Sequence, residues 1–109
     1  MRRGDIVIVA PPGEFGKPRP AVVVQADVFL EGHASVALCL LTTELVEAPL
    51  FRILVEPSRE NGLRTISQIQ ADKVMSVRRE RIRDSVGRLD EILLARLNRS
   101  LIAFLGLAG

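Results

Sequence analysis

The chain has 109 residues, 48% of them apolar, which is enough for a compact domain with a buried core. Aromatic residues make up only 4%, with no Trp and no Tyr, which argues against a protein that stacks bases on an aromatic sheet. The 15 Lys and Arg and 13 Asp and Glu leave a formal charge of +2. This mild excess fits contact with phosphate without requiring it.

The single cysteine, Cys39, lies in the apolar run Ala37-Leu38-Cys39-Leu40-Leu41. We therefore expect a small buried side chain rather than a reactive thiol. One cysteine allows no internal disulfide, and we recognise neither a secretory signal nor an apolar run of about 20 residues. These features favour a cytoplasmic protein with a single domain, residues 1–109.

Runs of β-branched and apolar residues, bounded by Gly, Pro, Asn and Ser, predict short strands along most of the chain. The predicted strands are 6–10, 21–25, 34–43, 50–55, 64–69 and 72–77. The first two, 6–10 and 21–25, are apolar on both faces, which indicates strands buried on both sides. Asn61-Gly62 is the strongest turn signal between them, because both residues tolerate positive φ.

The end of the chain is predicted to be a helix that begins after the N-cap Asp90 and stops at Gly106. An apolar stripe with three- and four-residue spacing marks its buried face: Leu93, Leu94, Leu97, Leu101, Phe104 and Leu105. Strands followed by one helix predict a mainly β fold with α, a small and strongly curved barrel-like sheet with a helix packed on it.

Residues 78–83, Arg-Arg-Glu-Arg-Ile-Arg, form the densest charged run. Either a solvated sheet edge or a helical turn explains this run. Glu80 and Asp84 dilute its positive field, so it is a weak signal for nucleic acid binding.

Arg19 stands between Pro18 and Pro20 at the start of the second predicted strand. Each proline fixes its own φ and pushes the preceding residue, Lys17 or Arg19, toward extended geometry. A guanidinium held in this way suits bidentate contact with a phosphate or carboxylate. The alternative is a solvated arginine at a strand edge.

Other polar residues stand at predicted strand ends, where a small barrel would bring them together: Lys17, Thr42, Thr43, Ser67, Gln70 and Asp72. A fixed cation, hydroxyl donors and a carboxylate suit metal-free cleavage of an RNA backbone. In that reaction Arg19 stabilises charge, Thr42 donates to the phosphate, and Asp72 is a base or an orienting group. The same residues also suit a purely structural role.

Two further candidates lie in predicted loops. Phe15 either stacks on a base or tucks back as a lid on the core. His33, the one histidine, is either an acid–base group or merely solvated. The local sequence does not decide between the two interpretations for Phe15 or for His33.

In its ordered motifs the sequence resembles the MazF/PemK family of toxins from bacterial toxin–antitoxin pairs. The motifs are Arg3-Gly4-Asp5-Ile6-Val7, the stretch from Lys17 to Val24, Leu41-Thr42-Thr43, Asn61-Gly62-Leu63, the stretch from Ala71 to Val77, Val86-Gly87-Arg88-Leu89-Asp90, and the Leu-rich helix. Each motif is modest alone, whereas their order and spacing are specific and span nearly the whole chain.

The resemblance implies an SH3-like β-barrel (CcdB/MazF-like) with a C-terminal helix, usually a homodimer. It implies an endoribonuclease that cuts single-stranded RNA at short motifs without metal or other cofactor, and a cognate antitoxin with an acidic tail that covers the RNA groove. The family's catalytic positions fall on Arg19, Thr42 and Asp72. We expect RNA contacts from Phe15, Lys17, Gln25, Thr43, Ser67, Gln70 and Lys73.

The chain departs from the family pattern at Gln70, where some members have an arginine. This removes one phosphate clamp or proton donor and places more of the chemistry on Arg19. A related branch with the same fold inhibits DNA gyrase, typically through a Trp-containing C-terminus. A chain without Trp that ends Leu-Gly-Leu-Ala-Gly is a poor match to that branch. A plain SH3-like interaction module is a third reading, disfavoured because its peptide grooves need aromatics.

Overall fold

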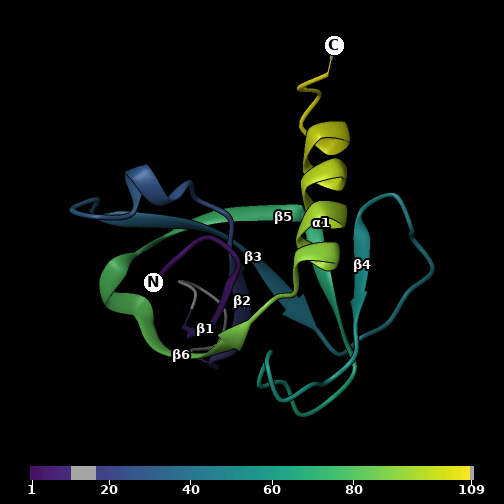
Figure 1. Ribbon diagram of the computed structural model, residues 1–109, viewed down its shortest axis with the longest axis horizontal. Coiled ribbons are helices and arrows are strands. Elements are labelled where there is room, and N and C mark those ends of the chain that lie inside the picture. Colours follow the sequence, from purple (N-terminus) through teal and green to yellow (C-terminus); the bar gives the residue numbers. More distant parts are fainter. Residues whose placement is uncertain (11–16, 109) are drawn as a thin grey trace.

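A computed structural model describes residues 1–10 and 17–108 of the chain (Figure 1). Within these residues six strands form one antiparallel sheet in the order β4-β5-β3-β2-β1-β6. The strands are β1 (Asp5–Val9), β2 (Arg19–Val23), β3 (Ser35–Thr42), β4 (Arg52–Val55), β5 (Ser67–Arg78) and β6 (Ile82–Arg88). The 3-10 turns η1 (Asp27–Phe29) and η2 (Arg79–Arg81) and the helix α1 (Glu91–Phe104) complete the fold. The predicted mainly β fold with a C-terminal helix is confirmed.

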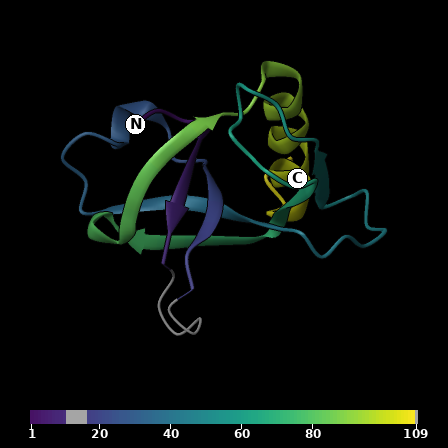
Figure 2. The same ribbon diagram turned by 90° about the horizontal axis from the view of Figure 1, so that it is seen from below.

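The sheet is strongly curved but is not closed by backbone pairing in the described part of the chain. Its edges are β4 and β6, and β6 curls back across the sheet (Figure 2). The segment between β4 and β5 packs against β6, where the backbone N–H of Arg88 donates to the carbonyl of Glu60 at 2.8 Å. Gly87 allows this approach, because a Cβ there would lie 2.3 Å from the Asn61 backbone.

Two strand predictions were wrong. Residues 64–69 and 72–77, predicted as separate strands, belong largely to the single long strand β5, whose pairing with β3 shifts register between Cys39 and Leu41. The charged run 78–83, expected as a sheet edge or a helical turn, contains the 3-10 turn η2 and the start of the edge strand β6, although no strand had been predicted over 82–88. An edge strand with mostly exposed residues lacks the alternation of apolar residues that reveals a strand in sequence.

Burial on both faces was predicted correctly for β1 and β2, because adjacent residues in them enter two separate cores, and β3 is buried in the same way. Ile6, Val22 and Cys39 face a core completed by α1, whereas Val7, Val23 and Leu38 face the core inside the curved sheet. Helix α1 contributes Leu94, Leu97 and Leu101 to the first core.

Helix α1 begins as predicted, with the Asp90 carboxylate accepting from the Leu93 N–H at 2.8 Å. It ends at Phe104, and Gly106 adopts the left-handed φ of 70° that a helix stop requires. The stripe predicted as buried is interrupted at the end, since Phe104 and Leu105 are exposed. No helix among the described residues is both long enough and apolar enough to span a membrane.

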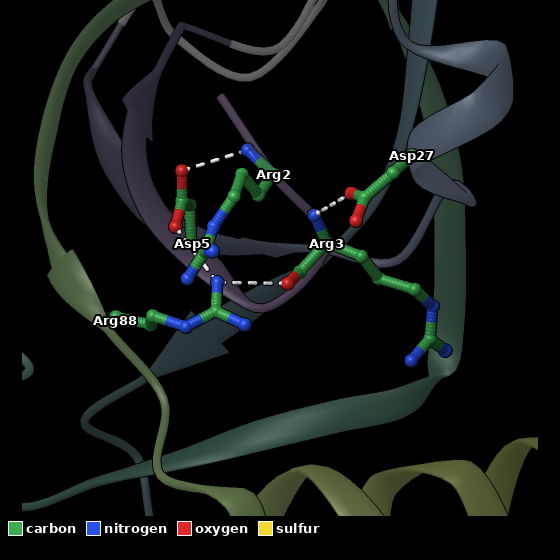
Figure 3. Close-up of polar contacts among 5 residues, drawn as sticks. All are labelled: Arg2, Arg3, Asp5, Asp27 and Arg88. Carbon is green, nitrogen blue, oxygen red and sulfur yellow. Dashed lines mark hydrogen bonds and ion pairs between the residues drawn. The ribbon is translucent and has the colours of Figure 1, made fainter.

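A polar network ties the start of the chain to β6 and η1 (Figure 3). The Arg88 guanidinium pairs with the Asp5 carboxylate at 3.0 Å and donates to the Arg3 carbonyl at 2.9 Å. The Arg3 N–H donates to the Asp27 carboxylate at 2.6 Å. These contacts hold β1 and β6 together immediately before α1.

Candidate active site

A groove of about 550 Å³ opens where β2 begins, β3 ends and β5 begins. Its lining residues are Lys17, Pro18, Arg19, Pro20, Leu41, Thr42, Thr43, Glu44 and Ser67. Of the predicted site residues, the groove brings together Lys17, Arg19, Thr42, Thr43 and Ser67.

Strand pairing explains this convergence. In β2 and β3, Ala21 is paired with Leu40, and continuing that antiparallel register by two residues places Arg19 opposite Thr42. On its other side β3 pairs with β5, where Thr42 lies opposite Gln68 and so leaves Thr43 beside Ser67. The start of β2, the end of β3 and the start of β5 therefore meet at one rim of the sheet.

The backbone around Arg19 is firmly placed by this pairing. Arg19 is paired with Val9 of β1, and Pro20 is paired with Ile8. The Arg19 side chain is partly buried in the groove wall. An arginine that is partly buried on a paired strand loses less freedom on binding an anion than a fully exposed one, which favours phosphate contact.

The hydroxyl groups of the groove differ in their hydrogen bonding. The Thr42 Oγ1 accepts from the Glu44 N–H at 3.1 Å, which leaves its own O–H to donate. The Ser67 hydroxyl already donates to the Thr65 carbonyl at 2.9 Å. Thr42 is therefore the better donor for a bound phosphate.

The groove continues past Thr43 and Ser67 into a second hollow of about 400 Å³. That hollow shares Pro20, Thr43 and Ser67 with the groove and adds Arg64 and Thr65. Lys17, Arg19 and Arg64 thus lie along one path, whereas Glu44 is the single acidic residue among the described side chains that line it. The combined surface is suited to a polyanion longer than one phosphate.

Two residues that the sequence did not indicate, Gln68 and Arg52, hold the loop that carries Glu44. The Gln68 side chain accepts from the Val46 N–H at 3.1 Å and donates to the Val46 carbonyl at 2.9 Å. Arg52 donates to Gln68 at 2.8 Å and to the Glu44 carbonyl at 3.1 Å. Gln68 lies 22 positions from Val46 and 16 from Arg52, so no local pattern in the sequence could reveal its contacts.

The structure places several other predicted residues away from the groove. Gln25 braces the turn after β2, accepting from the Ala37 N–H at 2.8 Å and donating to the Phe29 carbonyl at 2.7 Å. Gln70 is buried opposite Arg52, and Lys73 is exposed further along β5. Phe15 lies outside the described residues.

Asp72 also lies outside the groove lining. It follows Gln68 by four residues on β5, a separation on the order of 10 Å along an extended strand. Its Oδ1 is buried without a hydrogen-bond partner among the described residues. Its negative charge acts instead on Cys39, whose pKa burial raises to about 12, with Arg3 opposing and Asp72 adding to that rise. The structure therefore separates Asp72 from Arg19 and Thr42.

No group of three or more His, Cys, Asp or Glu in the described part of the chain is placed to hold a metal ion. The exposed His33 contributes its backbone carbonyl as an acceptor for Arg79 at 3.0 Å. It is not among the residues that line the groove.

The family described as PemK-like, MazF-like toxin of type II toxin–antitoxin system matches residues 2–105. The chain belongs to this family. Its sequence is 46% identical over 110 residues, covering all of both chains, to a probable endoribonuclease MazF of Mycolicibacterium smegmatis. The resemblance seen in the ordered motifs is thereby confirmed.

Solved structures agree on the fold. One is a mycobacterial endoribonuclease in complex with its cognate antitoxin, with a TM-score of 0.84 and 21% identity, covering 98% of this chain and 96% of that one. Another is a MazE–MazF structure from Deinococcus radiodurans, with a TM-score of 0.77 and 19% identity, covering 97% of this chain and 96% of that one. At such identities the likeness establishes the MazF-like fold of this toxin.

Proposed function

We propose that this MazF/PemK-family toxin is an endoribonuclease that cuts single-stranded RNA at short sequence motifs without a metal ion. The observation that carries the proposal is the convergence of Arg19 and Thr42 in one cationic groove. The name of the relative at 46% identity, a probable endoribonuclease, supports it. The open groove suits an unpaired strand, whose backbone can bend into it.

In the proposed reaction the ribose 2′-oxygen attacks the adjacent phosphorus as the bond to the 5′-oxygen breaks. Arg19 stabilises the negative charge that develops on the phosphorane, and the Thr42 O–H donates to a non-bridging oxygen. The 2′-hydroxyl gives its proton to a base, and the 5′-oxygen leaves with a proton from water. The products are a 2′,3′-cyclic phosphate, which hydrolyses to a 3′-phosphate, and a 5′-hydroxyl.

Two carboxylates are candidates for the base. Asp72 is the one expected from the family motif, but it is not among the groove-lining residues. Glu44 lines the groove beside Thr42. We propose Glu44 as the base, because a base must lie within hydrogen-bonding reach of the proton that it removes.

The proposed partners are the RNA substrate, a cognate antitoxin and a second copy of the toxin, all in the cytoplasm. Structures of similar fold contain an endoribonuclease with its cognate antitoxin and MazE with MazF. The cationic groove suits an acidic antitoxin segment as well as RNA.

The decisive experiment incubates the purified toxin with a long single-stranded RNA in EDTA and maps both ends of every fragment. Discrete cuts with cyclic or 3′-phosphate ends, absent with Arg19→Ala, are expected. RNA left intact across many sequences would overturn the proposal. Inhibition of gyrase supercoiling without RNA cleavage would instead assign the toxin to the gyrase-inhibiting branch.

A further inference from the structure

The second hollow, beside the groove of Arg19 and Thr42, has a lining of its own. Its volume of about 400 Å³ is within the range of sites that enclose a small organic group. It shares Pro20, Thr43 and Ser67 with the groove, so an RNA strand whose phosphate contacts Arg19 brings a neighbouring nucleotide to it. Nothing in the proposed cleavage chemistry uses the rest of its lining.

Aliphatic side chains form much of the wall of this hollow. Ile8 and Pro20 are paired across β1 and β2, so their side chains project from the same face of the sheet. Leu63 and Val86 complete the apolar lining, and Val86 is 38% exposed. Such walls cover the faces of an unstacked base and leave its edge to the polar groups of the hollow.

The charged side chain of the hollow is Arg64, whose guanidinium donates hydrogen bonds and accepts none. Among the described residues Arg64 has neither an ion pair nor a side-chain hydrogen bond. The described lining includes no Asp, Glu, Asn or Gln, so no carboxylate or amide oxygen there accepts from an amino group of a base. The hydroxyl groups of the lining adapt to either role, which leaves Arg64 as the selective group.

A cation that only donates distinguishes bases by the group on one edge of the ring. Guanine carries the carbonyl oxygen O6 and uracil the carbonyl oxygen O4, whereas adenine and cytosine carry an amino group at the corresponding position. A guanidinium donates to the carbonyl but meets the amino group donor against donor. A hydrogen bond from a charged donor is also stronger than a neutral one. The Arg64 guanidinium therefore favours a keto base over an amino base.

The loop that carries Arg64 is held in place by Asn61. The Asn61 side chain accepts from the N–H groups of Ser58 at 3.0 Å and Leu63 at 2.9 Å. It also donates to the Glu56 carbonyl at 2.9 Å. The same loop packs against β6, so the backbone immediately before Arg64 is fixed from two sides. A backbone held in this way loses less freedom on binding than an unbraced loop, which favours selective contact.

We propose that the second hollow binds the base of one nucleotide flanking the cut and that Arg64 makes this site select guanine or uracil over adenine or cytosine. The guanidinium donates to O6 or O4, and the aliphatic walls cover the faces of the base. Arg64 is thus a specificity-determining residue, whereas Arg19 and Thr42 act on the phosphate. The inference rests on the proposed endoribonuclease function and adds to it one position of the cleavage motif.

Oligonucleotides that cannot be cut test this base preference apart from cleavage. Fluorescence anisotropy compares heptamers of deoxyuridine and deoxycytidine, which lack the attacking 2′-hydroxyl and differ only along the base edge that carries O4 or N4. The unmodified toxin should bind the uracil heptamer at least about fivefold more tightly, since one hydrogen bond from a charged donor contributes this much or more. With Arg64→Ala, loss of that hydrogen bond should bring the two affinities within about twofold of each other.

Arg59→Ala is the matched control, because Arg59 is an exposed arginine earlier in the same loop and is not among the residues that line the groove or the hollow. It should leave the ratio of the two affinities unchanged. Thermal unfolding of both variants checks that each is folded.

End-mapped cleavage of a random-sequence RNA pool shows the same preference in the reaction. The unmodified toxin should leave guanine or uracil at one fixed nucleotide flanking each cut, whereas Arg64→Ala should admit all four bases there. Arg64→Gln should shift the preference toward adenine, because a glutamine amide both donates to and accepts from the adenine edge.

Three results would overturn the proposal. One is equal binding of the two heptamers by the unmodified toxin, or binding of neither. Another is a uracil preference that Arg64→Ala leaves unchanged, which would place base selection elsewhere. A third is an equal loss of affinity for both heptamers in Arg64→Ala, which would make Arg64 a phosphate contact. RNA left uncut by a toxin that still prefers the uracil heptamer would contradict the endoribonuclease proposal alone, so the two proposals fail separately.

Discussion

The side-chain amide of Gln68 hydrogen bonds to both backbone groups of Val46, a residue 22 positions away in the chain. This double contact fastens the β3–β4 loop to β5, and Arg52 extends it to the carbonyl of Glu44. Gln68 is only 8% exposed, whereas Val46 is 47% exposed, so the contact is partly buried and is covered mainly on the Gln68 side. Through these hydrogen bonds, β5 positions the loop that borders Thr42 and Thr43.

Replacing Gln68 with Leu should free this loop while keeping the volume of the side chain. We expect a loss of about 1–3 kcal/mol in the free energy of unfolding, because two hydrogen bonds to the Val46 backbone and one from Arg52 are lost, each worth about 0.5–1.5 kcal/mol. Urea unfolding measures this loss. RNA cleavage should fall through a higher KM rather than a lower kcat, since Gln68 is not among the groove-lining residues. Gln68→Glu keeps the acceptor, and it should retain more of the affinity for RNA. Equal KM values for all three proteins would contradict a positioning role.

Arg19→Ala should reduce kcat for RNA cleavage by about 10²-fold or more, because a group that stabilises transition-state charge typically contributes this much. Arg19→Lys should recover only part of the rate, since an ammonium cannot make the bidentate contact. Arg83→Ala, on an exposed arginine of β6, is the control and should leave kcat unchanged. A cleavage rate for Arg19→Ala within threefold of the unmodified toxin would remove Arg19 from the mechanism.

Glu44→Gln and Asp72→Asn together identify the base. Both changes are nearly isosteric and remove one negative charge, so the two proteins form a matched pair. We expect Glu44→Gln to lower kcat by about 10²-fold, within the range usual for a general base, and Asp72→Asn to lower it less than threefold. Single-turnover cleavage at saturating toxin isolates the chemical step. If Asp72→Asn lowers kcat more than Glu44→Gln does, Asp72 is the general base, as the family motif suggested.

From the buried thiol of Cys39 we predict how the free energy of unfolding depends on pH. Burial raises the pKa of its thiol from 9.0 to about 12, so the folded state holds a proton that the unfolded state releases. This contribution is fully present below pH 9 and is lost as the pH rises toward 12. The free energy of unfolding should therefore fall by up to about 1.4 kcal/mol per pH unit in that window.

The measurement is urea unfolding at several pH values between 8 and 11, compared with Cys39→Ala, in which this contribution is absent. Titrating lysines affect both proteins alike, so the difference between the two curves isolates the thiol. The same thiol should react with iodoacetamide only after urea unfolds the protein. Rapid labelling of the folded toxin at pH 8 would show that the thiol is not buried as described.

The sequence by itself determined the strands β1 to β4 closely, the helix with its Asp90 cap and Gly106 stop, and the meeting of Arg19 with Thr42. These features rest on local chemistry: β-branched runs, proline-fixed φ angles, an N-cap carboxylate and leucines at helical spacing. Since β2 and β3 are consecutive antiparallel strands, the start of one necessarily adjoins the end of the other. That geometry made the Arg19–Thr42 pair predictable.

Tertiary structure alone decided the rest. The register shift that makes β5 continuous depends on its pairing with β3, and β6 is a strand because β1 offers it an edge. Asp72 stands in the family's motif, yet the length of β5 carries it away from Arg19. Gln68 acquires a role only when the β3–β4 loop, 22 positions away, folds against it, and Arg52 when Gln68, 16 positions away, comes beside it. Such features arise from pairing between remote segments, which leaves no periodic signal in either segment alone.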